Sequence, residues 1–148
     1  MHTIAGSLLL IQTEPITSIA LEGTYDVDAH LDCLHRRRKH PDAPDPAKPQ
    51  RVWVHWVLYN LPPDSTGLGE AVTRDALPAG TEEGLNDWDR TGFGGPCPPI
   101  GRHRYFHKLY ALDTRLSGLS SPRKAAVEAA MKGHTLAEAT LIGTYIKE

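Results

Sequence analysis

The chain has 148 residues and a mass of 16.3 kDa, which suits one domain with a sizeable core. Its formal net charge of −2 lacks the basic excess expected of a general nucleic-acid-binding or anionic-membrane-binding protein. No apolar stretch approaches membrane-spanning length, and the start, MHTIAGSLLLIQTE, has neither a basic leader nor a long apolar stretch. We therefore expect a cytoplasmic protein.

The two cysteines, Cys33 and Cys97, are too few for a disulfide framework. Nothing in their spacing pairs them with each other or with a set of metal ligands. We therefore expect both to be thiols in a reducing compartment.

The first forty residues differ in character from the rest of the chain. Ile16–Leu21 shows some apolar alternation, but the following DVDAHLDCLHRRRKH has no clean period. The basic run His35–His40 is short, and such a run usually lies in a solvated loop. We therefore treat residues 1–40 as an atypical N-terminal segment that precedes the main domain at 41–148.

Strands and loops dominate the main domain, because 12 prolines and 13 glycines punctuate several β-rich runs of this chain. Val52–Leu61 is rich in Val, Trp and Tyr and apolar on both sides, so it predicts a central strand. Ser65–Gly92 has little periodicity and predicts a long loop, in which Ala71–Arg74 forms a short strand or a turn.

Arg102–Asp113 predicts a second strand, on which His103, Tyr105 and His107 share one face because side chains alternate. The turn before it contains three prolines, which fix φ and keep its shape without help from neighbours. Two imidazoles and a phenol beside a rigid Gly/Pro wall would form a small site rich in hydrogen-bond donors.

Helical signals occur near the C-terminus. Ser120 and Ser121 before Pro122 supply a capping hydroxyl and a first-turn proline, which predicts a helix over Arg123–Lys132 that breaks at Gly133. After it, apolar residues recur at i, i+4 and i+8 and favour a second helix, although β-branched content and a glycine leave a strand open; these residues are Ala137, Leu141 and Tyr145.

Three blocks in order carry a resemblance: PDAPDP at Pro41–Pro46, WVHWVLYNLPPD at Trp53–Asp64 and GGPCPPIGRHRYFHKLYALDT at Gly94–Thr114. Together they resemble the phosphatidylethanolamine-binding protein family, also called Raf-kinase-inhibitor-like proteins, and its compact bacterial branch. The resemblance covers Pro41–Glu148. It implies a mainly β fold, a β-sandwich-like arrangement around a large antiparallel sheet with C-terminal helices.

The resemblance also implies a shallow anion-binding pocket at one end of the sheet. Position by position, its residues are Asp42, Pro44, Trp53, His55, Gly95, Pro96, His103 and Tyr105. Imidazole and phenol groups would donate to a phosphate, and Asp42 would orient a histidine rather than touch the anion. Trp53 would form an apolar wall that could lie against an ammonium headgroup.

Two features depart from the resembled family. An acid normally precedes Pro-Asp-Ala-Pro, but this chain has His40, which puts ligand selectivity in doubt. In addition, codons chosen for His35–Arg38 can be read one base later as an apolar strand ending in acids, as the family has there. We hypothesise that the segment before Pro41 is translated out of its ancestral frame, which would impair binding; a divergent N-terminus is the alternative.

Some of these residues could have a structural role instead of a binding role. By residue type, His55 could be a core histidine with a backbone partner, and His107 structural or exposed. Arg104 faces away from His103 and should form an ion pair, with Asp113, Asp87 or Asp89 as candidate partners. The remaining aromatics are expected to pack in the core (Tyr59 and Tyr110) or in a loop (Trp88).

Three classes of function are consistent with the sequence. The first is a non-catalytic module that binds a small anion such as phosphate, acetate or phosphoethanolamine, without cofactor or metal. The second is an enzyme, with His103 and His55 as an acid/base pair or Cys97 as a nucleophile, but no nucleophile elbow or close-spaced ligand pair supports it. The third is an interaction protein that inhibits a kinase or protease, or that forms a homodimer. We favour the first.

Overall fold

The structure is a computed structural model, and it describes residues 18–22, 52–98 and 101–146. Most of its regular structure is strand, which confirms the mainly β fold. The elements are β1 (Ser18–Glu22), β2 (Val57–Leu61), the 3-10 helix η1 (Arg74–Ala76), β3 (Glu82–Glu83), β4 (Arg102–Leu112), α2 (Lys124–Met131) and β5 (Thr135–Ile146). Within these residues no helix has the length and apolar character needed to cross a membrane.

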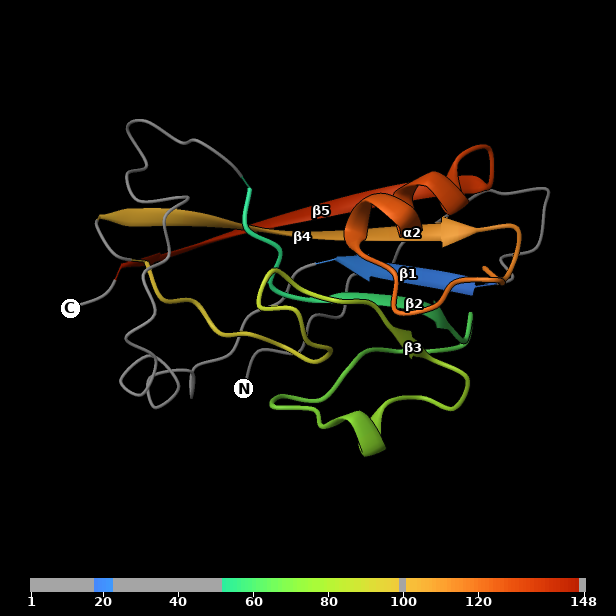
Figure 1. The fold of residues 1–148 in the computed structure, drawn as a ribbon, viewed down its shortest axis with the longest axis horizontal. Helices are drawn as coiled ribbons and strands as arrows, with labels where there is room; N and C mark the ends of the chain where they lie inside the picture. Colours follow the sequence, from blue (N-terminus) through green and yellow to red (C-terminus); the bar gives the residue numbers. More distant parts are fainter. Residues whose placement is uncertain (1–17, 23–51, 99–100, 147–148) are drawn as a thin grey trace.

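The strands form a five-stranded sheet in the order β3-β2-β1-β4-β5, with every neighbouring pair antiparallel (Figure 1). The central strand, β1, comes from the N-terminal segment: Ile19 lies opposite Leu61 of β2, and Ala20 lies opposite Tyr110 of β4. This part of the atypical segment is therefore built into the sheet. The codon argument for a shifted reading frame concerns His35–Arg38, which lie outside the described residues, so that hypothesis stays a prediction.

The core lies on both faces of β2, as its continuous apolar sequence predicts. Val57 and Tyr59 belong to a cluster on one face, and Trp56 and Leu58 belong to a cluster on the other. The strand itself is shorter than the expected Val52–Leu61, since it begins at Val57. The residues before it are held by loop contacts rather than by a strand ladder.

The helix α2 covers the first of these faces, near the end of β4 (Figure 1). Its Val127 and Met131 are buried against β1, β2 and β4, and Gly133, with φ +84°, ends it as expected. The predicted serine cap is wrong. Arg123 occupies the N-cap position without a side-chain cap, because the two serines stand too far upstream to reach the first free N–H groups.

The predicted second C-terminal helix is also wrong, because Thr135–Ile146 forms β5 and pairs with β4 from Arg102↔Ile146 to Leu112↔Thr135. The spacing of four that suggested a helix is an even number, so it also places residues on one face of a strand. The hydrogen-bonded pairing along the length of β4 favours the strand over the helix, and the β-branched Thr and Ile residues of this segment also favour a strand. The short element expected at Ala71–Arg74 is a turn followed by η1.

Candidate functional site

His55 lies just before β2 and is held by a backbone carbonyl and two aromatic rings. Its Nδ1 is 2.6 Å from the carbonyl oxygen of Gly94. Its ring meets Trp88 edge-on at a centroid distance of 5.2 Å and Tyr105 at 5.3 Å. Three segments far apart in the sequence therefore fix one imidazole: the strand entry, the loop before the proline turn, and β4.

The bond to Gly94 decides which ring nitrogen of His55 carries the proton. A carbonyl oxygen can only accept, so Nδ1 must be the donor, and the neutral ring presents Nε2 as an acceptor. Burial lowers the pKa of His55 below its ordinary 6.5, against the opposing effects of the Gly94 bond and of Asp87, while nearby His107 lowers it further. Near neutral pH the site therefore offers a lone pair at Nε2.

The lowered pKa of His55 gives a test of this arrangement in the whole protein. The unfolded chain binds a proton at this position near pH 6.5 and the folded chain only at lower pH, so stability should fall as the pH drops below 6.5. The variant His55→Asn should lose less stability over that range, because it has no such group. Urea unfolding of both proteins at pH 8 and pH 5 checks this, and equal losses would contradict it.

Trp88 forms the wall behind His55, and its position depends on the absence of a side chain at Gly94. A Cβ at Gly94 would lie 2.2 Å from Cζ3 of Trp88, inside any real contact distance. Trp88 also meets the ring of Trp53 edge-on, with the centroids 5.3 Å apart. The indole is thus wedged between Trp53, His55 and the Gly94 backbone.

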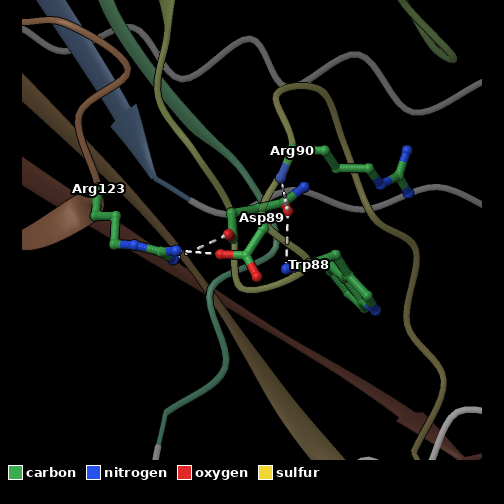
Figure 2. A network of polar contacts seen from close by, with 5 residues as sticks. Trp88, Asp89, Arg90 and Arg123 are labelled. Atoms are coloured by element: carbon green, nitrogen blue, oxygen red, sulfur yellow. Dashed lines mark hydrogen bonds and ion pairs between the residues drawn. The ribbon is translucent and has the colours of Figure 1, made fainter.

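The loop that carries Trp88 folds around the buried side chain of Asn86. Its Oδ1 accepts from the backbone N–H groups of Trp88 at 2.9 Å and Arg90 at 3.3 Å, and its Nδ2 donates to the Gly92 carbonyl at 2.8 Å. Asn86 is fully buried, so these bonds are made away from water. Figure 2 shows the resulting turn, with Trp88 and Arg90 on either side of Asp89.

The same loop is fastened to the start of α2. Asp89 forms an ion pair with Arg123, the N-cap residue of the helix (Figure 2). In addition, the Leu85 N–H donates to the Pro122 carbonyl at 2.8 Å. Between these two loop residues, Asp87 makes two hydrogen bonds to the backbone of Val54: its Oδ2 accepts from the Val54 N–H at 2.9 Å, and its N–H donates to the Val54 carbonyl at 3.0 Å. The loop therefore joins α2 to the segment that holds His55.

β4 supplies the other side of the site. His103, Tyr105 and His107 are half-buried and alternate with exposed residues, as the sequence predicts. Burial, and to a lesser extent nearby Tyr145, raise the pKa of Tyr105 to about 12. The phenol therefore keeps its proton at any physiological pH and can serve as a hydrogen-bond donor but not as a base.

A protein-family model with the description phosphatidylethanolamine-binding protein matches residues 39–146 of this chain. The chain belongs to the phosphatidylethanolamine-binding protein family. A relative named UPF0098 protein, from Methanothermobacter thermautotrophicus, is 55% identical over 103 residues, 68% of each chain. A UPF0098 protein from Chlamydia trachomatis is 39% identical over 108 residues, which cover 73% of this chain and 69% of the relative.

Solved structures of the phosphatidylethanolamine-binding protein family share the fold. A homologue from Chlamydia trachomatis has a TM-score of 0.67 at 32% identity, covering 93% of this chain and 78% of its own. Escherichia coli YbcL, described as a member of the mammalian family, has a TM-score of 0.65 at 31% identity, covering 90% and 73%. The predicted family and fold are therefore confirmed.

The site residues expected from family membership fall into three groups. Trp53, His55 and Tyr105 are brought together through their ring contacts and through Trp88, and His103 lies on the same face of β4 as Tyr105. Gly95 and Pro96 follow the Gly94 carbonyl directly, with Pro96 buried. Asp42, Pro44 and the departing His40 lie outside the described residues, so their roles stay predictions.

Several residues near His55 were not predicted as part of the site. The sequence predicts loop packing for Trp88 and a structural or exposed place for His107, yet Trp88 contacts the imidazole and His107 acts on its charge. Asp87 and the carbonyl of Gly94 were not predicted either. The available signal was the Asn-Asp-Trp turn followed shortly by the glycine pair that begins at Gly94, since glycine lets a large ring lie on the backbone.

Two expectations about individual residues are wrong. Cys97 is disulfide-bonded and not a thiol; Cys33 lies outside the described residues. Among the residues that the structure describes, Arg104 does not form the expected ion pair with Asp113, Asp87 or Asp89. Its guanidinium lies over the ring of Phe106, 5.4 Å from the centroid, and the three acids contact other residues. Asp89 pairs with Arg123, Asp113 with His134, and Asp87 with the Val54 backbone. Within the described ranges, no group of three or more His, Cys, Asp or Glu side chains could hold a metal ion.

Proposed function

We propose that this protein is a non-catalytic binding module for a small oxyanion, such as the phosphate of a phospho-headgroup, at the site around His55. The observation that carries the proposal is the convergence of His55, Tyr105 and Trp88 at one place, on a chain of the phosphatidylethanolamine-binding protein family. His103, Gly95 and Pro96 would complete the site, together with Asp42 and Pro44. The cytoplasmic location expected from the sequence stays a prediction, and the disulfide at Cys97 argues against it.

The chemistry of the described groups supports binding. A phosphate needs donors held in place, and Tyr105 keeps its proton because its pKa is about 12. His55 is fixed by the Gly94 carbonyl and by two rings before any ligand arrives, which saves the entropy of ordering it. The apolar faces of Trp53 and Trp88 would exclude water beside the anion and strengthen its hydrogen bonds.

Cys97 and Tyr105 are poorly suited to catalysis. A nucleophilic Cys97 would have to be a thiolate, but its sulfur is in a disulfide. Tyr105 is too weak an acid to act as a base near neutral pH. These two observations favour a binding module over the hydrolase considered from the sequence.

A ligand screen by thermal unfolding tests the proposal, with phosphoethanolamine, phosphate and acetate added in turn. A ligand at about a hundred times its Kd should raise the melting temperature by roughly 5–10 °C. Tyr105→Phe, which removes the donor and keeps the ring, should reduce that rise. His134→Ala is the matched control, because this histidine is exposed and bonds Asp113 beyond the far end of β4. No rise with any of these ligands, or ester hydrolysis that His103→Ala abolishes, would contradict the proposal.

A further inference from the structure

The rings of His55 and Tyr105 are in contact and differ in hydrogen-bonding character: the neutral imidazole can only accept at Nε2, whereas the phenol can also donate. Nδ1 of His55 is committed to the Gly94 carbonyl, and Nε2 has no partner among the described residues. Nε2 therefore accepts, and the phenol of Tyr105, 5.3 Å away between ring centroids, donates. An oxyanion that accepts from this hydroxyl can also satisfy Nε2 only if it carries a proton to donate.

We propose that this site selects an oxyanion that carries a proton, namely a phosphate monoester in its monoprotonated form, over oxyanions that carry none. This inference rests on the proposed function and names the chemical class of its ligand. The P–OH group would donate to Nε2 of His55, and an unprotonated oxygen would accept from the Tyr105 hydroxyl. A sulfate ester has three similar oxygens but no proton to donate, so one oxygen would face the lone pair of Nε2.

The alternative is that His55 takes up a proton and donates from both nitrogens. Among residues 18–22, 52–98 and 101–146, the charged groups that act on His55 are Asp87 on the loop, which favours the imidazolium, and His107 on β4, which opposes it. Burial is the larger effect and also opposes it, so the pKa of His55 lies below 6.5. At pH 6.5 and above the acceptor form of Nε2 prevails, and a fully deprotonated oxygen beside it would be repelled.

Methyl phosphate and methyl sulfate form a matched pair for the test. Monoprotonated methyl phosphate and methyl sulfate have a similar shape and the same charge of −1, and they differ in the central atom and in the one proton that only the phosphate carries. Titration calorimetry of the full chain at pH 6.5 is suitable, because the second pKa of a phosphate monoester is about 6 and a substantial fraction is monoprotonated. We expect methyl phosphate to bind at least about tenfold more tightly, the effect of one unsatisfied hydrogen bond.

The variant His55→Asn distinguishes the role of Nδ1 from that of Nε2. Its amide N–H can still donate to the Gly94 carbonyl, but it has no group in place of Nε2. We expect this variant to bind methyl phosphate more weakly than the wild type does, and to bind methyl phosphate and methyl sulfate about equally. The control His134→Asn, at an exposed position, should change neither the affinity nor the preference. In the wild-type protein, the ¹⁵N NMR signal of Nε2 should be that of an unprotonated ring nitrogen, and it should move when methyl phosphate is added.

The outcomes distinguish the inference from the function on which it rests. Equal binding of the two esters, a preference for the sulfate, or a protonated Nε2 at pH 6.5 would overturn the inference and leave an anion-binding site in place. Failure of both esters, phosphate and phosphoethanolamine to bind would overturn the proposed function itself, and the inference with it.

Discussion

Replacing Asn60 with alanine should lower the free energy of unfolding by about 4 kcal/mol. Asn60 is 1% exposed at the end of β2. Its Nδ2 donates to the Leu116 carbonyl at 2.8 Å and to Oε1 of Glu82 at 2.9 Å, and its Oδ1 accepts from the Leu116 N–H at 2.8 Å. Alanine would leave both backbone groups of Leu116 without these partners inside the protein.

The backbone adds to the effect at this position, because Asn60 has φ +61°, a conformation that asparagine tolerates better than alanine does. Asn60→Gly is therefore the matched control: it removes the same hydrogen bonds but accepts the backbone. We expect it to be less destabilising than alanine by about 1 kcal/mol. Urea unfolding measures both, and an alanine variant within about 1 kcal/mol of the wild type would show that water replaces the lost bonds.

The sheet was predictable wherever a single pattern decided the structure. β4 matches its predicted range within one residue, since its alternating side chains leave no helical reading. β5 was not predictable from spacing, because Ala137, Leu141 and Tyr145 share a face in a helix and in a strand alike. Only its partner β4, which lies earlier in the chain, resolves that ambiguity.

The site was predicted in part, and the missing part has a physical reason. His55 and Tyr105 were expected together because family resemblance supplied their proximity, which no local period contains. The contact of Trp88 with Gly94 depends on how a loop folds around Asn86, and no repeating pattern describes such a loop. The tautomer of His55 depends in turn on the Gly94 carbonyl, so it follows only from the folded chain.

Replacing Gly94 with alanine should both destabilise the protein, by about 3 kcal/mol, and weaken binding of the oxyanion. The new methyl group would lie 2.2 Å from Cζ3 and 2.6 Å from Cε3 of Trp88, so either the indole or the Gly94 backbone must move. Movement of the backbone shifts the carbonyl that holds Nδ1 of His55. Movement of the indole removes the wall behind the imidazole.

Two further variants assign the effect of Gly94→Ala to the contact with Trp88. Gly69→Ala is the matched control, since it has no positive φ and no atom within 4 Å of the added methyl group, and its stability should stay within about 0.5 kcal/mol of the wild type. Trp88→Leu in the Gly94→Ala background removes the clashing ring atoms. Because the two sites touch, their effects should not add, and the double variant should be more stable than the sum of the single changes predicts. Additive losses in urea unfolding would show that Gly94 is required for some reason other than the Trp88 ring.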